Sequence, residues 1–144
     1  MAVMVTGMGI CTAMAGIRMG LQSAHSVSSL ELSRHMAEDV RQFSLGLAFK
    51  DPQGGGTFGP EESGPSLFDD VDDLDGLVQS PPIDSNGDER TNESGWTQTV
   101  IVKNLDPDTL EAADDGTTTL LLLTVNIERG DQLIGVYQWL TADR

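Results

Sequence analysis

MAVMVTGMGICTAMAGI, residues 1–17, carries no charged side chain, and the helix-compatible pattern that it begins continues unbroken to residue 49. A single helix of that length would extend ~70 Å. A chain of 144 residues cannot enclose such a helix, so we expect its first half to lie in lipid or against neighbouring subunits. A secretory signal peptide would need basic residues before the apolar stretch, and none precede it. A helix buried in a soluble protein would need more apolar surface than the rest of the chain offers.

The two halves of the predicted helix differ in character. Residues 1–21 are rich in small side chains, which let helices approach one another closely. The small residues expected at helix–helix contacts are Gly7, Gly9, Ala13 and Gly16. Residues 22–49 are amphipathic, because apolar side chains recur at helical spacing along one face. The residues of this face, which we expect to pack on a sheet, are Leu32, Met36, Val40, Phe43 and Leu47.

Residues 50–144 are predicted to form an acidic globular domain. Its first part, residues 50–95, has the composition of an irregular loop, and Asp51-Pro52 at its start ends the helix. Residues 96–140 form a three-stranded meander in this prediction, with strands at 96–105, 120–128 and 132–140. The short turn before the last strand favours antiparallel pairing. The fold class is therefore α+β: a long N-terminal helix whose second half packs on a small antiparallel sheet.

One segment of the irregular loop, FDDVDDLDGL at residues 68–77, alternates apolar and acidic side chains. Its apolar members are expected to anchor a short turn against the domain while the aspartates face water. These anchors are Phe68, Val71, Leu74 and Leu77.

The acidic charge is concentrated in the second part of the chain. Residues 1–50 hold four basic and three acidic side chains, which sum to +1, and residues 51–144 hold four basic and twenty acidic, which sum to −16. This acidic body repels phosphate backbones, so nucleic acid is not an expected partner. High acidity by itself mainly indicates solubility.

One short segment has the alternating oxygen ligands of a calcium loop. These candidate ligands are Asp84, Asn86 and Asp88. The glycine falls at the fourth position rather than the sixth, and Gly95 stands at the twelfth, where a glutamate is expected. A plain surface turn at Asn86-Gly87 is the alternative interpretation. The aspartates of residues 69–75 are a second candidate for a divalent ion, with a solvated acidic loop as the alternative.

The order of these parts resembles the type IV pilin family. Residues 1–10, MAVMVTGMGI, and the stretch through Ala15-Gly16 to Leu21 resemble the apolar helix of prepilin-like proteins, especially minor pilins and type II secretion pseudopilins. The aspartate segment followed by Pro81-Pro82 is similar to a loop of this group. So are Gly95-Trp96, the stretch TVNI at 124–127 and the final YQWL at 137–140. The resemblance covers essentially the whole chain.

One departure from the family concerns processing. The family's site is a glycine followed by a phenylalanine or methionine-like residue, with a glutamate five residues into the mature protein. The first acidic residue here is Glu31. We therefore expect that residues upstream of Met1, including the processing site, are missing. Cleavage and N-methylation are not assigned to any residue.

The resemblance implies a structural subunit, a minor pilin or pseudopilin that assembles through its N-terminal helix. Its implied partners are other pilin or pseudopilin subunits, the inner membrane before assembly, and a prepilin peptidase if the upstream site exists. The implied location is the inner membrane, spanned once, with a periplasmic or extracellular C-terminal domain. No motif indicates catalysis or a cofactor other than calcium. The alternative is a membrane-anchored periplasmic or extracellular binding module whose acidic loop captures calcium or a basic partner.

Overall fold

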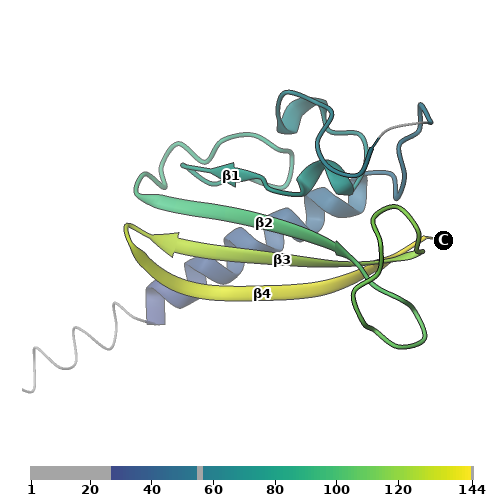
Figure 1. The fold of residues 1–144 in the computed structure, drawn as a ribbon. Coiled ribbons are helices and arrows are strands. Elements are labelled where there is room, and N and C mark those ends of the chain that lie inside the picture. The colour runs from purple at the N-terminus through teal and green to yellow at the C-terminus, as the bar shows by residue number, and fades with distance from the viewer. Residues whose placement is uncertain (1–26, 55–56, 144) are drawn as a thin grey trace, which may run out of the picture. The chain divides into compact units, whose positions relative to one another are not determined.

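A computed structural model describes residues 27–54 and 57–143 of the chain. Contacts divide the chain into two units, Met1–Leu32 and Ser33–Arg144, and the second contains the whole β-sheet. A helix runs through residues 27–46 (Figure 1). The four small residues predicted to pack between helices lie at positions 7, 9, 13 and 16, outside the described residues.

The sheet has four antiparallel strands in the order β1-β2-β3-β4, which confirms the α+β class in general. The strands are β1 (Val78–Gln79), β2 (Trp96–Asn104), β3 (Leu120–Arg129) and β4 (Gln132–Ala142). The three predicted strands are present as β2 to β4. Strand β1 was not predicted, because two residues are too few to show alternation.

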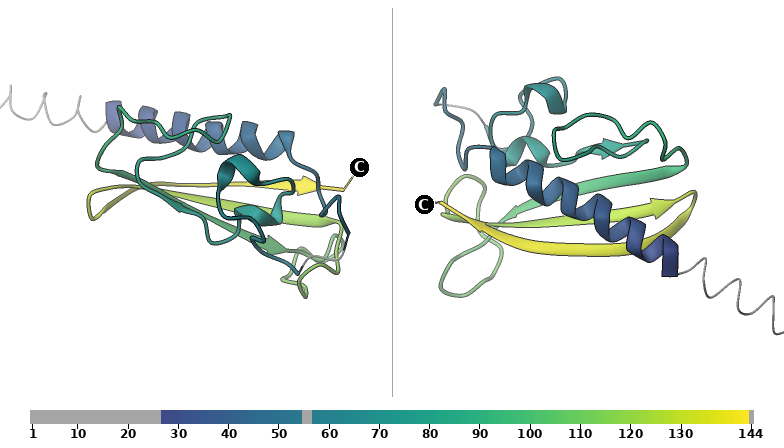
Figure 2. Two further views of the ribbon diagram at one scale, coloured as in Figure 1. Left: turned by 90° about the horizontal axis from the view of Figure 1, so that it is seen from above. Right: turned by 180° about the vertical axis from the view of Figure 1, so that it is seen from behind.

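Within the second unit, the helix from Ser33 onward covers one face of the sheet (Figure 2). The buried face of β3 is the predicted one, and its residues are Leu121, Leu123, Val125 and Ile127. On the helix, Met36 and Val40 are fully buried as expected, and Phe43 is half-buried. Leu47, predicted on the same face, lies just after the helix ends at residue 46 and is also half-buried. The other buried helix residues, Ser33, Ala37 and Ser44, are small. The buried face of the helix is therefore centred on these small residues together with Met36 and Val40, to one side of the predicted row.

A buried glutamine joins the helix to the sheet. Gln98 of β2 has no exposed surface, and its Nε2 donates to the Met36 carbonyl oxygen over 3.0 Å. Its Oε1 accepts the backbone N–H of Ile83 at 3.2 Å. One polar side chain thus connects the helix, a central strand and the loop after β1. Such a buried group is stable only while both ends are paired.

The predicted single-pass location in the inner membrane is contradicted. Among residues 27–54 and 57–143, no helix is both long enough and apolar enough to cross a bilayer.

We expect Gly87→Ala to destabilise the protein by about 2 kcal/mol. Gly87 has a φ of +84°, and a Cβ there would lie 3.0 Å from the Phe43 ring and 3.4 Å from the Pro65 carbonyl oxygen. Gly116→Ala is the matched control, because Gly116 has a φ of +69° but no atom within 4 Å of such a Cβ. Urea unfolding of both variants separates the contact from the backbone strain. Equal losses in the two variants would contradict the role of the contact.

Candidate functional site

The aspartate segment of residues 68–77 lies against the end of the helix rather than in open solvent. Backbone hydrogen bonds join Ala48 to Asp69 and Val71, over 3.0 and 2.9 Å. This pairing aligns the chain after the helix with the segment before the short 3-10 helix η2 (Asp72–Leu74). The anchors Val71 and Leu74 are buried as expected.

Two of the aspartates do not face water, so the expectation for this segment was wrong for Asp70 and Asp73. Each has only 1% of its surface exposed. The Asp73 carboxylate accepts backbone N–H groups of Asp69 at 3.0 Å, Asp70 at 3.4 Å and Glu61 at 3.3 Å. These bonds compensate its burial and hold the loop of residues 57–62 against η2. Asp70 and Asp73 are three residues apart, as are the buried Val71 and Leu74. This shared spacing was the signal in the sequence that the two aspartates could be buried as well.

Asp70 lies beside Asp72, and this pairing changes its acidity. Burial, followed by the hydrogen bond and charge of Asp72, raises the pKa of the Asp70 carboxyl to about 8. Asp70 is therefore protonated in the folded protein at neutral pH. Two carboxyl groups that share one proton are a common way to avoid two adjacent buried charges.

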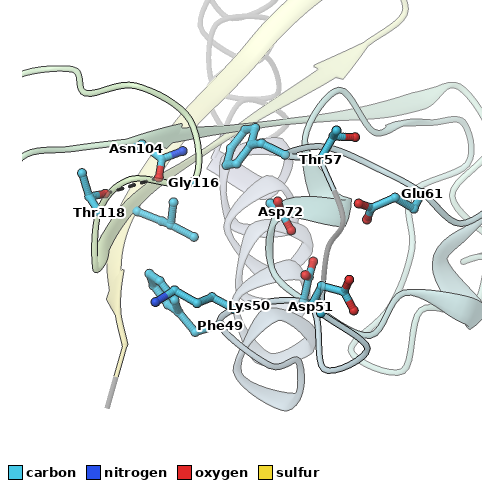
Figure 3. A pocket seen from close by; sticks show the side chains of 13 residues that line it. Phe49, Lys50, Asp51, Thr57, Glu61, Asp72, Asn104, Gly116 and Thr118 are labelled. Atoms are coloured by element: carbon cyan, nitrogen blue, oxygen red, sulfur yellow. Dashed lines mark hydrogen bonds between the residues drawn. The ribbon is translucent and has the colours of Figure 1, made fainter.

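A cavity of about 280 Å³ opens beside this pair (Figure 3). The Asp51, Glu61 and Asp72 carboxylates lie on one side of it, while Phe49, Asn104 and Thr118 lie on the other. The Thr118 hydroxyl is 3.3 Å from Oδ1 of the buried Asn104, and the Asn104 Nδ2 is buried with no hydrogen-bond partner among the described residues. The cavity thus places carboxylates opposite a wall of mixed character, aromatic at Phe49 and polar at Asn104 and Thr118, and the Lys50 ammonium group also belongs to its lining.

The described residues contain one group of three carboxylates close enough to share a metal ion, Glu61, Glu62 and Asp73, with ligand oxygens within 4.8 Å of one another. Glu62 shares a hydrogen bond with Asp73. This bond, together with desolvation and the Asp73 charge, raises the pKa of the Glu62 carboxyl to about 7. Glu62 therefore carries a proton in about half of the molecules near pH 7. A cation bound here would have to displace that proton.

The predicted calcium ligands lie in a different loop and form a tight turn. Asp84 Oδ1 accepts the backbone N–H groups of Asn86 and Asp88 at 2.7 and 3.1 Å, and these bonds hold the pKa of Asp84 below its usual value. The Asp84 backbone N–H also donates to the Asp88 carbonyl oxygen over 2.8 Å. This oxygen of Asp84 therefore stabilises the turn itself. Calcium binding by Asp84, Asn86 and Asp88 stays a prediction.

No protein-family model, curated protein or solved structure matches this chain. The physical properties of the site are therefore the basis for its chemistry. Crowded carboxyl groups can exchange a proton or attract a cation.

Proposed function

We propose that this chain is a structural subunit of the pilin-like class, a minor pilin of a type IV pilus or a pseudopilin of a type II secretion system. It assembles with pilin or pseudopilin subunits through the segment that precedes the described helix. The support is the sequence resemblance together with the order of parts: one helix, an irregular acidic loop, and an antiparallel sheet on which the helix packs one face.

The single observation that carries the proposal is the apolar surface that the helix leaves exposed. Val27 and Leu30, on the part of the helix before Ser33, are each 54% exposed, and Leu45, on the part that packs on the sheet, is 58% exposed. A helix that packed only on its own sheet would carry polar side chains at such positions. Exposed apolar side chains along a helix are suited to contacts with neighbouring helices.

We expect Gly9→Asp or Ala13→Asp to abolish assembly of the full chain. Gly9 and Ala13 belong to the uncharged segment, and a carboxylate packed among apolar helices without a partner costs several kcal/mol. Sedimentation and negative-stain electron microscopy of the purified chain, alone and with its host's pilin subunits, measure the loss.

Gln42→Asp is the matched control, because Gln42 is exposed on the described helix of residues 27–46. It adds the same charge outside the uncharged segment and is expected to leave assembly unchanged. Filament incorporation by Gly9→Asp and Ala13→Asp at the wild-type level would overturn the proposal.

A further inference from the structure

Strand β4 is an uncharged edge on a strongly acidic protein. Its residues, QLIGVYQWLTA at 132–142, include no acidic or basic side chain, whereas the whole chain has a net charge of −15. Among the described residues no strand pairs with its outer side, since β4 is the last strand in the sheet order (Figure 1). Proteins usually protect long edge strands with charged residues or proline, and β4 has neither.

The hydrogen-bond pattern identifies which backbone groups face the open side. The backbone N–H of Asp143 donates to the Thr119 carbonyl oxygen over 3.0 Å, so Asp143 faces β3. The Leu105 N–H donates to the Leu120 carbonyl oxygen over 2.9 Å, so the backbone groups of Leu120 face β2. By alternation, the backbone groups of Leu121 and Leu123 face β4. The two observations agree with the register of β3 and β4. Alternation along an antiparallel strand then directs four residues outward: Val136, Gln138, Leu140 and Ala142.

The four outward residues form a regular segment. The register shift between β3 and β4 falls at Ile127 and Glu128, opposite the start of β4, and pairing is continuous from Gly135 to Ala142. Each outward residue offers one N–H and one C=O group. Val136 and Leu140 are also 52% and 53% exposed, so apolar surface lies next to the open backbone groups.

Charge decides which partner fits this edge. A basic partner would be attracted to the acidic body but would find no carboxylate on β4, and another acidic surface would be repelled. A neutral strand matches a neutral strand. The β4 of a second copy brings its own uncharged edge, so no charged side chain of either β4 enters the contact.

We propose that β4 is a self-association edge, at which a second copy of this chain pairs its own β4 antiparallel and extends the sheet across both copies. Such pairing is isologous, because the same residues of both copies meet around a twofold axis. It adds backbone hydrogen bonds on both sides without rearranging either sheet. This pairing is additional to the proposed assembly through the segment that precedes the described helix, and it does not depend on that assembly.

Residue-resolved amide hydrogen exchange on the full chain tests the pairing at low and high protein concentration. The outward amides of Val136, Gln138 and Leu140 are expected to exchange ~10-fold more slowly at high concentration. The amides that face β3 are expected to change less. The same measurement on Gly9→Asp separates the two proposals, since protection at β4 should persist there even when assembly through the leading segment is lost.

Two substitutions at Gln138 complete the test. Gln138→Pro removes one outward N–H and no backbone hydrogen bond to β3, at a position that tolerates proline in edge strands. It also removes the side-chain hydrogen bond from Gln138 Nε2 to Thr124 Oγ1 of β3, 3.0 Å long, and Thr124→Val, which removes that bond alone, is the control for this loss. Gln138→Lys brings like charges together near the twofold axis. Both are expected to abolish the concentration-dependent protection, while Thr99→Lys on the interior strand β2 retains it. Thermal melting verifies that each variant is folded. Outward amides that exchange equally fast at both concentrations, or protection that survives in both folded Gln138 variants, would overturn the proposal.

Discussion

Asp70→Asn is expected to stabilise the protein at pH 8 and above and to flatten its stability profile between pH 4 and pH 8. The cause is the raised pKa of the Asp70 carboxyl, which burial and the adjacent Asp72 shift from 3.8 to about 8. Between those two values the folded state holds a proton that the unfolded state has lost. The free energy of unfolding therefore falls as pH rises through this window, and it levels off above pH 8.

Asparagine reproduces the protonated form of Asp70. Its Oδ1 can still accept the Asp73 backbone N–H, which is 3.3 Å from the Asp70 carboxylate oxygen. Its amide can donate to Asp72 as the acid proton does. One pKa unit corresponds to about 1.4 kcal/mol, and the neighbouring carboxyls share part of the effect, so the expected gain at pH 8 is about 2 kcal/mol.

Urea unfolding at a series of pH values measures the Asp70 effect. Asp131→Asn is the control, because Asp131 is an exposed acid in the turn between β3 and β4. If wild type and Asp70→Asn showed parallel stability profiles between pH 5 and 9, the shared proton would be excluded.

Gln98→Met is expected to lower the free energy of unfolding by about 3 kcal/mol. Methionine has nearly the volume of glutamine, so the substitution leaves no large cavity. It removes both hydrogen bonds of a side chain with no exposed surface, and the Ile83 N–H is left buried without a partner. The Met36 carbonyl oxygen also loses its bond across the helix–sheet interface.

The control for this variant is Gln132→Met at the exposed start of β4. Surface changes of this kind usually alter stability by less than ~0.5 kcal/mol. If Gln98→Met lost no more stability than the control, the buried glutamine would not be an energetic link between helix and sheet.

Local pattern predicted the strands because alternation is a property of neighbouring residues. Leu121, Leu123 and Val125 recur every second residue, and their burial follows from that spacing alone. The helix face was predicted less accurately. Hydrophobicity selected Phe43 and Leu47, yet the buried positions include Ser33 and Ser44. Their hydroxyls are paired with the Tyr137 hydroxyl and the Arg41 carbonyl oxygen, contacts that the helical spacing does not reveal.

The acidic loop marks where prediction from sequence was insufficient. Aspartates are normally solvated, so burial of Asp70 and Asp73 was not expected. Their burial depends on partners elsewhere in the chain: the Ala48 backbone for the segment as a whole, and the Glu61 N–H for the Asp73 carboxylate. The shared proton and the adjoining cavity follow from those distant contacts.

The sequence by itself determined that a helix precedes three strands, which face of β3 is buried, and that the acidic charge falls outside β4. These properties follow from the order and spacing of side chains along the chain. Only the tertiary structure decided that β4 has an open side, that Gln98 meets Met36, and that two aspartates are enclosed. Each of these depends on which distant residues come into contact, and local composition does not contain that information.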